Sequence, residues 1–424
     1  MTTSARETVA SVPGSKSATA RALFLAAAAE GTSRLRSPLV STDTEAFLGA
    51  LQSLGFATER DRSVWTITGN PSGPTAESAR VWCHDSGTAA RFLPALAALG
   101  HGRFLVDASE QMRARPMEPL VNALRQLGVG VEPAPGNRLP LHIDAAGVGG
   151  GTVSMDAGVS SQFLSALCLM APATAQGLRI EVTDLVSAPY LEMTLAMMRE
   201  FGADPSWDGS TVVIPPTGYQ ARDYQIEPDA STASYFFAAA AVTGNTITVP
   251  GLGLRSMQGD LRFATEVLAS MGCEVRVELD YTTVTGPQQL HSPGEVVMRD
   301  ISDTMMTLAA IAPFADAPVR IVDVANTRLK ESDRIDAITE ALDVCGIVTR
   351  TGPDWLEIEP GTPTAGTVKT RSDHRIAMSM SVLGLRTPGV QLDDPGCVAK
   401  TYPGFHEDFA TLRADWDIPG EYRL

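Results

Sequence analysis

Basic and hydroxyl side chains gather at several points of the chain, each time just before a run of Ala, Leu and Phe. The clearest examples are SKSATAR from Ser15, SGTAAR from Ser86 and SDHRIAM from Ser372. A helix N-terminus binds anions because its free N–H groups and dipole favour negative charge. Asp303 and Glu331 lie in or beside the segments that carry these basic residues. This combination predicts a surface that binds an anionic ligand.

Each residue has a simpler explanation when it is taken alone. A Ser or Asp before a helix is commonly an N-cap, and a surface Arg is usually only solvated. The basic residues nevertheless recur at one phase of the chain, against a net charge of −16. We therefore predict a site for a ligand with two anionic groups, formed by Lys16, Arg21, Arg115, Lys330, Arg334, Arg375 and Lys400.

These basic residues recur at regular intervals because the chain contains an internal repeat. Segments of the same kind begin roughly seventy residues apart, at Ser86, Ser160, Ser231, Ser302 and Ser372. A second series, in which a glycine closes an amphipathic pattern, keeps the same spacing at Gly55, Gly128, Gly202, Gly272 and Gly346. Glycine fits the left-handed position after a helix. The sequence thus predicts two helices in every repeat.

Short alternating patterns such as TSRLRS, GRFLVD and LRIEV follow the Ala-rich segments and predict strands. Further strands, such as SVWTITG and WLEIEP, lie before the next repeat. Because helices and strands alternate throughout, the fold class is α/β. Six such units divide naturally into two halves of three.

Composition sets the outer limits. The 424 residues are 44% hydrophobic, and the net charge of −16 argues against nucleic-acid or membrane-surface binding. The five cysteines form no CxxC pair and no metal-like spacing, which favours a reducing cytoplasm. The start MTTSARETVA has no apolar signal region, and no stretch is long enough to span a membrane. We expect a cytoplasmic protein without a metal.

Nine short motifs resemble, in the same order along the chain, those of the 3-phosphoshikimate 1-carboxyvinyltransferase (EPSP synthase) family. They are PGSKSATAR, SGTAARF, RARPM, GVSSQFL, DLVSAPY, DASTASYF, NTRLKESDR, SDHRIAM and AKTYP. The resemblance covers nearly the whole chain. It implies two similar domains, each of three βαβαββ-type units in an inside-out α/β barrel. The domains would be 14–228 and 1–13 plus 229–424, with the active site in the cleft between them.

The reaction that the resemblance implies transfers the enolpyruvyl group of phosphoenolpyruvate to the 5-hydroxyl of shikimate 3-phosphate, with release of phosphate. No metal or organic cofactor is expected, the two substrates are the only implied partners, and the enzyme is expected to be a monomer. Glyphosate is expected to occupy the phosphoenolpyruvate pocket.

Carried over position by position, the resemblance assigns residues to each substrate. For shikimate 3-phosphate these are Lys16, Ser17, Arg21, Ser160, Ser161, Gln162, Ser187, Tyr190, Asp303, Asn326 and Lys330. For phosphoenolpyruvate they are Lys16, Gly87, Arg115, Gln162, Arg334, Arg375 and Lys400. Asp303 resembles the base that takes the hydroxyl proton, Glu331 the donor of a proton to the methylene carbon, and Lys16 a catalytic cation. Tyr190 should lie beneath the shikimate ring.

Two alternatives remain open. The related enolpyruvyl transferases that act on UDP-N-acetylglucosamine usually carry a reactive cysteine in the second repeat, and the corresponding DASEQMRARPMEP has none. A catalytically silent anion-binding repeat protein would be expected to lose Asp303, Glu331 and the lysines, and all are present.

Overall fold

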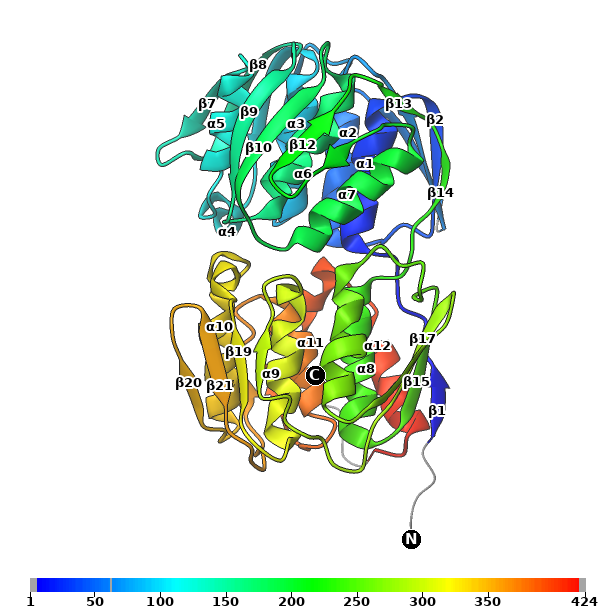
Figure 1. Cartoon of the computed structure of the whole chain (residues 1–424), viewed down its shortest axis with the longest axis vertical. Helices are drawn as coiled ribbons and strands as arrows, with labels where there is room; N and C mark the ends of the chain where they lie inside the picture. The colour runs from blue at the N-terminus through cyan, green and yellow to red at the C-terminus, as the bar shows by residue number, and fades with distance from the viewer. Residues whose placement is uncertain (1–5, 62, 419–424) are drawn as a thin grey trace. The chain divides into compact units, whose positions relative to one another are not determined.

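The computed structural model describes residues 6–61 and 63–418, and the chain divides into two compact units (Figure 1). Gly14–Glu227 form one, here called the N-unit, and Met1–Pro13 with Pro228–Leu424 form the other, the C-unit. Residues 1–5 and 419–424, which end the second predicted domain, lie outside the described residues.

Three repeats make up the N-unit. The first contains α1 (Lys16–Ala28), β2 (Ala29–Arg36), α2 (Thr42–Ser53), β3 (Ala57–Arg60) and β4 (Val64–Gly69). The second contains β5 (Ser78–Trp82), α3 (Gly87–Ala98), β6 (His101–Asp107), α4 (Glu110–Arg113), α5 (Glu118–Gln126), β7 (Gly130–Ala134) and β8 (Arg138–Ala146). The third contains β9 (Gly151–Ala157), α6 (Ser161–Met170), β10 (Leu178–Leu185), α7 (Ala188–Glu200), β11 (Ser206–Trp207) and β12 (Thr211–Ile214), and it is followed by β13 (Tyr219–Gln220) and β14 (Asp223–Gln225).

The C-unit continues the pattern. The fourth repeat contains β1 (Glu7–Val9), α8 (Ala230–Thr243), β15 (Thr246–Pro250), β16 (Glu274–Val277) and β17 (Tyr281–Thr285). The fifth contains β18 (Glu295–Val297), α9 (Met305–Ile311), β19 (Val319–Val322), α10 (Arg334–Val344), β20 (Thr349–Thr351) and β21 (Trp355–Ile358). The sixth contains β22 (Thr367–Val368), α11 (His374–Leu383), β23 (Gln391–Leu392) and α12 (Phe405–Asp415).

Each four-stranded sheet combines a parallel pair with an antiparallel hairpin. In the second repeat β5 and β6 are parallel, β8 pairs antiparallel with β6, and β7 pairs antiparallel with β8. The first repeat takes its parallel strands from β13 and β14, and the fourth takes its parallel strand from β1. Residues distant in sequence therefore complete these two sheets, and β1 joins the amino-terminal segment to the C-unit.

The helix boundaries follow the local sequence. Ser15, Ser86 and Ser160 cap α1, α3 and α6 by accepting a backbone N–H through the side-chain oxygen. The predicted closing glycines all have positive φ, at 92° for Gly55, 81° for Gly128, 92° for Gly202, 93° for Gly272 and 75° for Gly346. The closing glycines are thus confirmed at all five positions and the serine caps at three, whereas Asp229 rather than Ser231 caps α8 and Asp373 rather than Ser372 caps α11.

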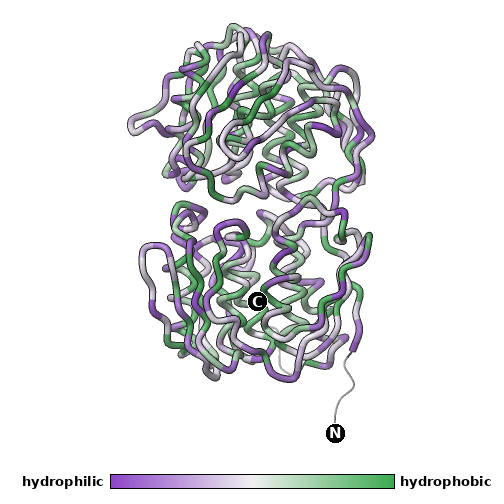
Figure 2. Tube along the Cα trace, in the orientation of Figure 1, coloured by the Kyte–Doolittle hydropathy of each residue, from purple (hydrophilic) through white to green (hydrophobic). Residues whose placement is uncertain are grey.

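The Ala-rich helices form the interior of each unit. In the N-unit α1, α3 and α6 contact one another, and in the C-unit α8, α9 and α11 do the same. Nearly every residue of α1, α3 and α8 is buried. A helix that is apolar on all sides must be buried, and alanine allows close helix packing. Figure 2 shows the apolar chain concentrated in these central helices.

Three repeats depart from the predicted pattern. The sixth has a two-stranded parallel sheet, formed by β22 and β23, where four strands were expected. In the fourth, a 3₁₀ turn (Gly259–Leu261) and a π-helix (Phe263–Leu268) replace the regular second helix. In the fifth, a 3₁₀ turn (Ser302–Thr304) precedes α9, so the helix does not start at Ser302.

In the part of the chain that the structure describes, no helix is long and apolar enough to cross a membrane.

Candidate active site

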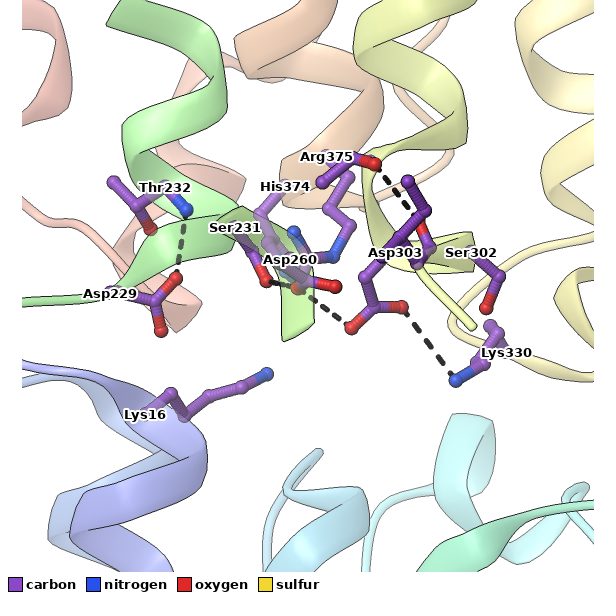
Figure 3. Close-up of polar contacts among 12 residues, drawn as sticks. Lys16, Asp229, Ser231, Thr232, Asp260, Ser302, Asp303, Lys330, His374 and Arg375 are labelled. Atoms are coloured by element: carbon purple, nitrogen blue, oxygen red, sulfur yellow. Dashed lines mark hydrogen bonds and ion pairs between the residues drawn. The ribbon is translucent and has the colours of Figure 1, made fainter. Parts of the chain in front are cut away.

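In the C-unit the starts of three helices meet at the carboxylate of Asp303. Asp303 lies in the 3₁₀ turn before α9, Arg334 begins α10, and Arg375 is the second residue of α11. The Asp303 carboxylate accepts from Arg334 Nη1 at 3.0 Å and from Arg375 Nη2 at 2.8 Å, and Lys330 Nζ lies 3.6 Å away. Figure 3 shows Asp303 between Arg375 and Lys330.

Arg334 binds three carboxylates. Besides its contact with Asp303, its Nη2 donates to Glu331 at 2.7 Å and its Nε donates to Asp373 at 2.9 Å. Asp373 also caps α11 by accepting from the backbone N of Arg375, and it accepts from Ser332 Oγ at 2.9 Å. Arg334 and Asp373 are fully buried, so this pairing fixes the loop that carries Glu331.

The cluster sets the protonation of Asp303. Burial alone would raise the pKa of this carboxyl, but Arg375, Lys330 and Arg334 together hold the pKa well below its usual range. Burial acts against the charge of Arg334, yet Asp373, Glu331 and Asp303 raise its pKa. Three cations thus balance three carboxylates, and Asp303 is ionised at neutral pH.

Two other predicted residues of the C-unit are also buried. Asn326 donates through Nδ2 to Ser302 Oγ at 3.2 Å. This bond holds Asn326 beside the 3₁₀ turn that carries Asp303. Lys400 ends the 3₁₀ segment Pro395–Lys400, which packs on α11.

In the N-unit Lys16 lies at the start of α1, and the guanidinium of Arg115 lies beside the start of α3. Lys16 is the first residue of α1, and its Nζ lies 3.4 Å from the carboxylate of Asp43. Gly87 begins α3, and a Cβ added there would lie 2.8 Å from Nη1 of Arg115. Glycine at this position therefore leaves room for the Arg115 guanidinium.

Arg21 joins three helices of the N-unit through neutral groups. It donates to the hydroxyls of Thr194 at 2.7 Å and Ser165 at 3.2 Å, and to the carbonyls of Ser17 at 3.0 Å and Tyr190 at 3.1 Å. These partners come from α1, α6 and α7. Arg21 thereby ties the predicted substrate residues Ser17 and Tyr190 to one centre.

Burial dominates the electrostatics of Arg21. Its side chain is fully buried, and this desolvation lowers the pKa to about 10, which leaves the guanidinium charged at neutral pH. Its Cζ lies 5.5 Å from the ring centre of Phe92 and 5.8 Å from that of Tyr190. The aromatic faces offset part of the cost of burying the charge.

The remaining predicted residues of the N-unit lie at the starts of α6 and α7. Ser160 caps α6, Ser161 begins it, and Gln162 accepts from Arg91 Nη1 at 2.7 Å. Ser187 precedes α7 with φ 55°, a left-handed conformation that is rare for a residue with a Cβ. Such strain is common at functional sites.

Sequence reasoning missed five residues that contact the predicted ones. They are Asp43 on Lys16, Arg91 on Gln162, Thr194 and Ser165 on Arg21, and Tyr235 on Arg375. Arg91 lies in the SGTAAR motif and Tyr235 in DASTASYF, so the motifs contained a signal for these two. Asp43 and Thr194 lie on second helices, where no sequence feature distinguished them.

The C-unit cluster can bind an anion and transfer protons. Lys330, Arg334 and Arg375 converge where a phosphate or carboxylate could replace the carboxylate of Asp303 or Glu331 as their partner. Within residues 6–61 and 63–418, no group of three or more His, Cys, Asp and Glu side chains is arranged to hold a metal ion.

Comparison with known proteins gives consistent matches. The family model for EPSP synthase (3-phosphoshikimate 1-carboxyvinyltransferase) matches residues 2–409. The 3-phosphoshikimate 1-carboxyvinyltransferase of Nostoc punctiforme is 42% identical over 405 residues, which cover 94% of each chain. The chloroplastic relative from Petunia hybrida is 39% identical over 419 residues, which cover 93% of this chain and 81% of the relative.

Two solved structures share the fold. The EPSP synthase from Acinetobacter baumannii aligns with a TM-score of 0.81 at 24% identity and covers 96% of each chain. The enolpyruvyl transferase NikO from Streptomyces tendae aligns with a TM-score of 0.75 at 19% identity, covering 97% of this chain and 94% of NikO. The predicted α/β repeat fold is confirmed.

Proposed function

The chain belongs to the EPSP synthase family, and we propose that it transfers the enolpyruvyl group of phosphoenolpyruvate to the 5-hydroxyl of shikimate 3-phosphate. The products are 5-enolpyruvylshikimate 3-phosphate and phosphate. The observation that carries the proposal is the group around Asp303, in which one ionised carboxylate contacts three cations and a second carboxylate, Glu331, shares Arg334 with it.

In the addition step, the 5-hydroxyl oxygen attacks C2 of phosphoenolpyruvate. Asp303 takes the hydroxyl proton, and Glu331 gives a proton to C3. In the elimination step C3 returns a proton to Glu331, the bond between C2 and the phosphate oxygen breaks, and the proton held by Asp303 leaves with the phosphate. Positioned acids and bases of this kind contribute about 10²–10⁴-fold each.

Anion binding would prepare both carboxylates. Arg334 and Arg375 hold Asp303 in its ionised form, and Arg334 also contacts Glu331. When the phosphate and carboxylate of phosphoenolpyruvate bind the arginines, the two side chains lose these partners. Their affinity for protons then rises, because a nearby cation is what favours a carboxylate's charged form.

The other proposed contacts follow the family resemblance. Shikimate 3-phosphate would be bound by Lys16, Ser17, Arg21, Ser160, Ser161, Gln162, Ser187, Tyr190, Asn326 and Lys330. Phosphoenolpyruvate would be bound by Lys16, Gly87, Arg115, Gln162, Arg334, Arg375 and Lys400. Burial and fixed hydrogen bonds support a positioning role for several of them, notably Arg21, Asn326 and Arg334. The set is divided between the units, so neither unit alone carries it.

A phosphate-release assay tests the function directly. Purified protein is given phosphoenolpyruvate with either shikimate 3-phosphate or UDP-N-acetylglucosamine, and released phosphate is measured. We expect turnover only with shikimate 3-phosphate. Turnover only with the nucleotide sugar would identify the related transferase instead, and no turnover with either would favour a silent anion-binding protein.

We further propose that the protein acts as a monomer in the cytoplasm. One chain contains every residue of the proposed set, and its five cysteines are free thiols, which a reducing compartment preserves. Light scattering of the active protein measures its mass, and a dimer would contradict the first part of this proposal.

A further inference from the structure

The guanidinium of Arg375 is held on two sides. Its Nη2 donates to the carboxylate of Asp303 at 2.8 Å, and its Nη1 donates to the hydroxyl of Tyr235 at 3.4 Å. Tyr235 lies on α8, Asp303 before α9 and Arg375 on α11, so each repeat of the C-unit supplies one member. The orientation of Arg375 thus depends on a residue that the family resemblance did not assign.

Tyr235 is built into the core of the C-unit. Its side chain is fully buried, and its ring packs edge-on against Phe405 with the ring centres 6.0 Å apart. This packing fixes the hydroxyl, since a buried aromatic ring has few alternative rotamers. Burial raises the pKa of Tyr235 to about 12, so the hydroxyl is neutral in any ordinary assay.

The two partners of Arg375 differ in how they would respond to an anion. Asp303 carries a charge, and an arriving phosphate or carboxylate competes with it for the guanidinium. Tyr235 is neutral, and its hydroxyl accepts a hydrogen bond from the other terminal nitrogen, Nη1. An anion that binds at Nη2 therefore does not compete with Tyr235 for the guanidinium. The hydroxyl can therefore keep one edge of the guanidinium fixed while the ion pair with Asp303 is exchanged.

We propose that Tyr235 is a positioning residue for phosphoenolpyruvate, acting through Arg375. It does not touch the reacting atoms. Its hydroxyl fixes the direction in which Arg375 presents its charge, so that binding the substrate costs less ordering of a long side chain. This proposal rests on the proposed function, because it takes Arg375 as a ligand of that substrate.

The test is the variant Tyr235→Phe, which removes one oxygen and keeps the ring against Phe405. A hydrogen bond to a charged group contributes measurably, but 3.4 Å is long for an N–H···O bond. We therefore expect the KM for phosphoenolpyruvate to rise about five- to tenfold. The KM for shikimate 3-phosphate should stay within about twofold, because Tyr235 hydrogen-bonds Arg375, which is proposed for phosphoenolpyruvate alone.

Tyr219→Phe is the matched control. Tyr219 is also a buried tyrosine, and its hydroxyl donates to the carbonyl of Leu169 at 3.0 Å inside the N-unit. It loses the same atom, so its melting temperature shows what a buried hydroxyl contributes to folding alone. Both kinetic constants of this control should match the wild type.

A double-mutant cycle with Arg375→Gln separates positioning from stability. If Tyr235 acts through Arg375, Tyr235→Phe should have no further effect on phosphoenolpyruvate in that background. If KM for this substrate is too high to measure, the rise in melting temperature caused by inorganic phosphate replaces it.

An unchanged KM for phosphoenolpyruvate in Tyr235→Phe would overturn the proposal, and so would an equal rise in both KM values. Failure of this variant to fold, with Tyr219→Phe folded, would assign the hydroxyl to stability and overturn it as well. Inactivity of the wild type would instead reject the proposed function, and the phosphate-induced shift would then still test whether Tyr235 supports anion binding by Arg375.

Discussion

Replacing Asp303 with Asn tests the charge balance of the cluster. The substitution keeps the shape of the side chain and one carbonyl oxygen, but removes the charge that faces Arg334, Arg375 and Lys330. Of the three carboxylates in the cluster, two would then remain beside the three cations, those of Glu331 and Asp373. We expect a folded protein that has lost turnover, is less stable, and binds phosphate more tightly than the wild type.

The loss of stability can be worked from the contacts. Breaking a buried ion pair by removing one partner costs about 3–5 kcal/mol. Arg334 keeps Glu331 and Asp373, and the new amide oxygen can still accept one bond, so the main loss is in the ion pairs that Asp303 makes with Arg375 and Lys330. The side chain of Asp303 is 18% exposed, so water also reaches it. We therefore expect about 2 kcal/mol in the free energy of unfolding.

The effect should depend on pH with a defined sign. The pKa of Asp303 is lower in the folded chain than in the unfolded chain, where it is about 3.9. Its contribution to stability is therefore complete above about pH 5 and is lost as the pH falls below about 4, towards the depressed folded pKa. The difference in stability between wild type and Asp303→Asn should be largest at neutral pH and shrink in acid.

Urea unfolding at pH 7 and pH 3 measures this difference, because the lower pH lies below the unfolded-state pKa of Asp303, and melting curves with added phosphate measure anion binding. Turnover is followed by phosphate release and should fall about 10²–10⁴-fold if Asp303 is the base. A stability difference that is the same at both pH values, or a phosphate-induced shift no larger than that of the wild type, would refute the charge argument. Normal turnover would refute the role of Asp303 as a base.

Three further outcomes are expected. Lys16→Met should abolish turnover in a folded protein, and Lys16→Arg should also be poor because the guanidinium is larger than the ammonium; normal rates in either would remove Lys16 from the site. Glu331→Ala should suppress entry of solvent deuterium into the methylene group, seen by mass spectrometry, more than Asp303→Asn does, and equal exchange in both would contradict the division of proton roles. Gly87→Ala should raise the KM for phosphoenolpyruvate roughly two- to tenfold, because the new methyl group displaces the Arg115 guanidinium; an unchanged KM would show that the guanidinium moves without consequence.

Much of the local structure could be predicted from sequence because its causes lie within a few residues. Ser15 and Ser86 cap helices whose first turns directly follow them, and Gly55 and Gly346 take the left-handed φ that ends a helix. Because the chain repeats, the closing glycines could be predicted in five units and the serine caps were found in three. The fourth and fifth repeats depart from the pattern at Phe263–Leu268 and Ser302–Thr304, where packing in the folded unit selects π and 3₁₀ geometry.

The types of the site residues were also available from the chain. Lysine and arginine side chains at the same position of successive repeats indicated an anion-binding site. The motifs around Lys16 and Lys330 indicated the family and, through it, the proton-transfer chemistry. The side chains that contact those residues could not be predicted from the sequence. Arg21 could have paired with a carboxylate, and the fold instead surrounds it with the neutral oxygens of Thr194 and Ser165.

The sequence by itself determined the repeat, the helix ends and the side chains that can do chemistry, because each depends on neighbours along the chain. Only the tertiary structure decided that β1 completes the fourth sheet, that Arg334 and Arg375 share Asp303, and that a tyrosine holds Arg375. Tyr235 and Arg375 are separated by 140 residues. Contacts over such distances arise from the packing of α8, α9 and α11 around one core, and no local pattern records which side chains that packing brings together.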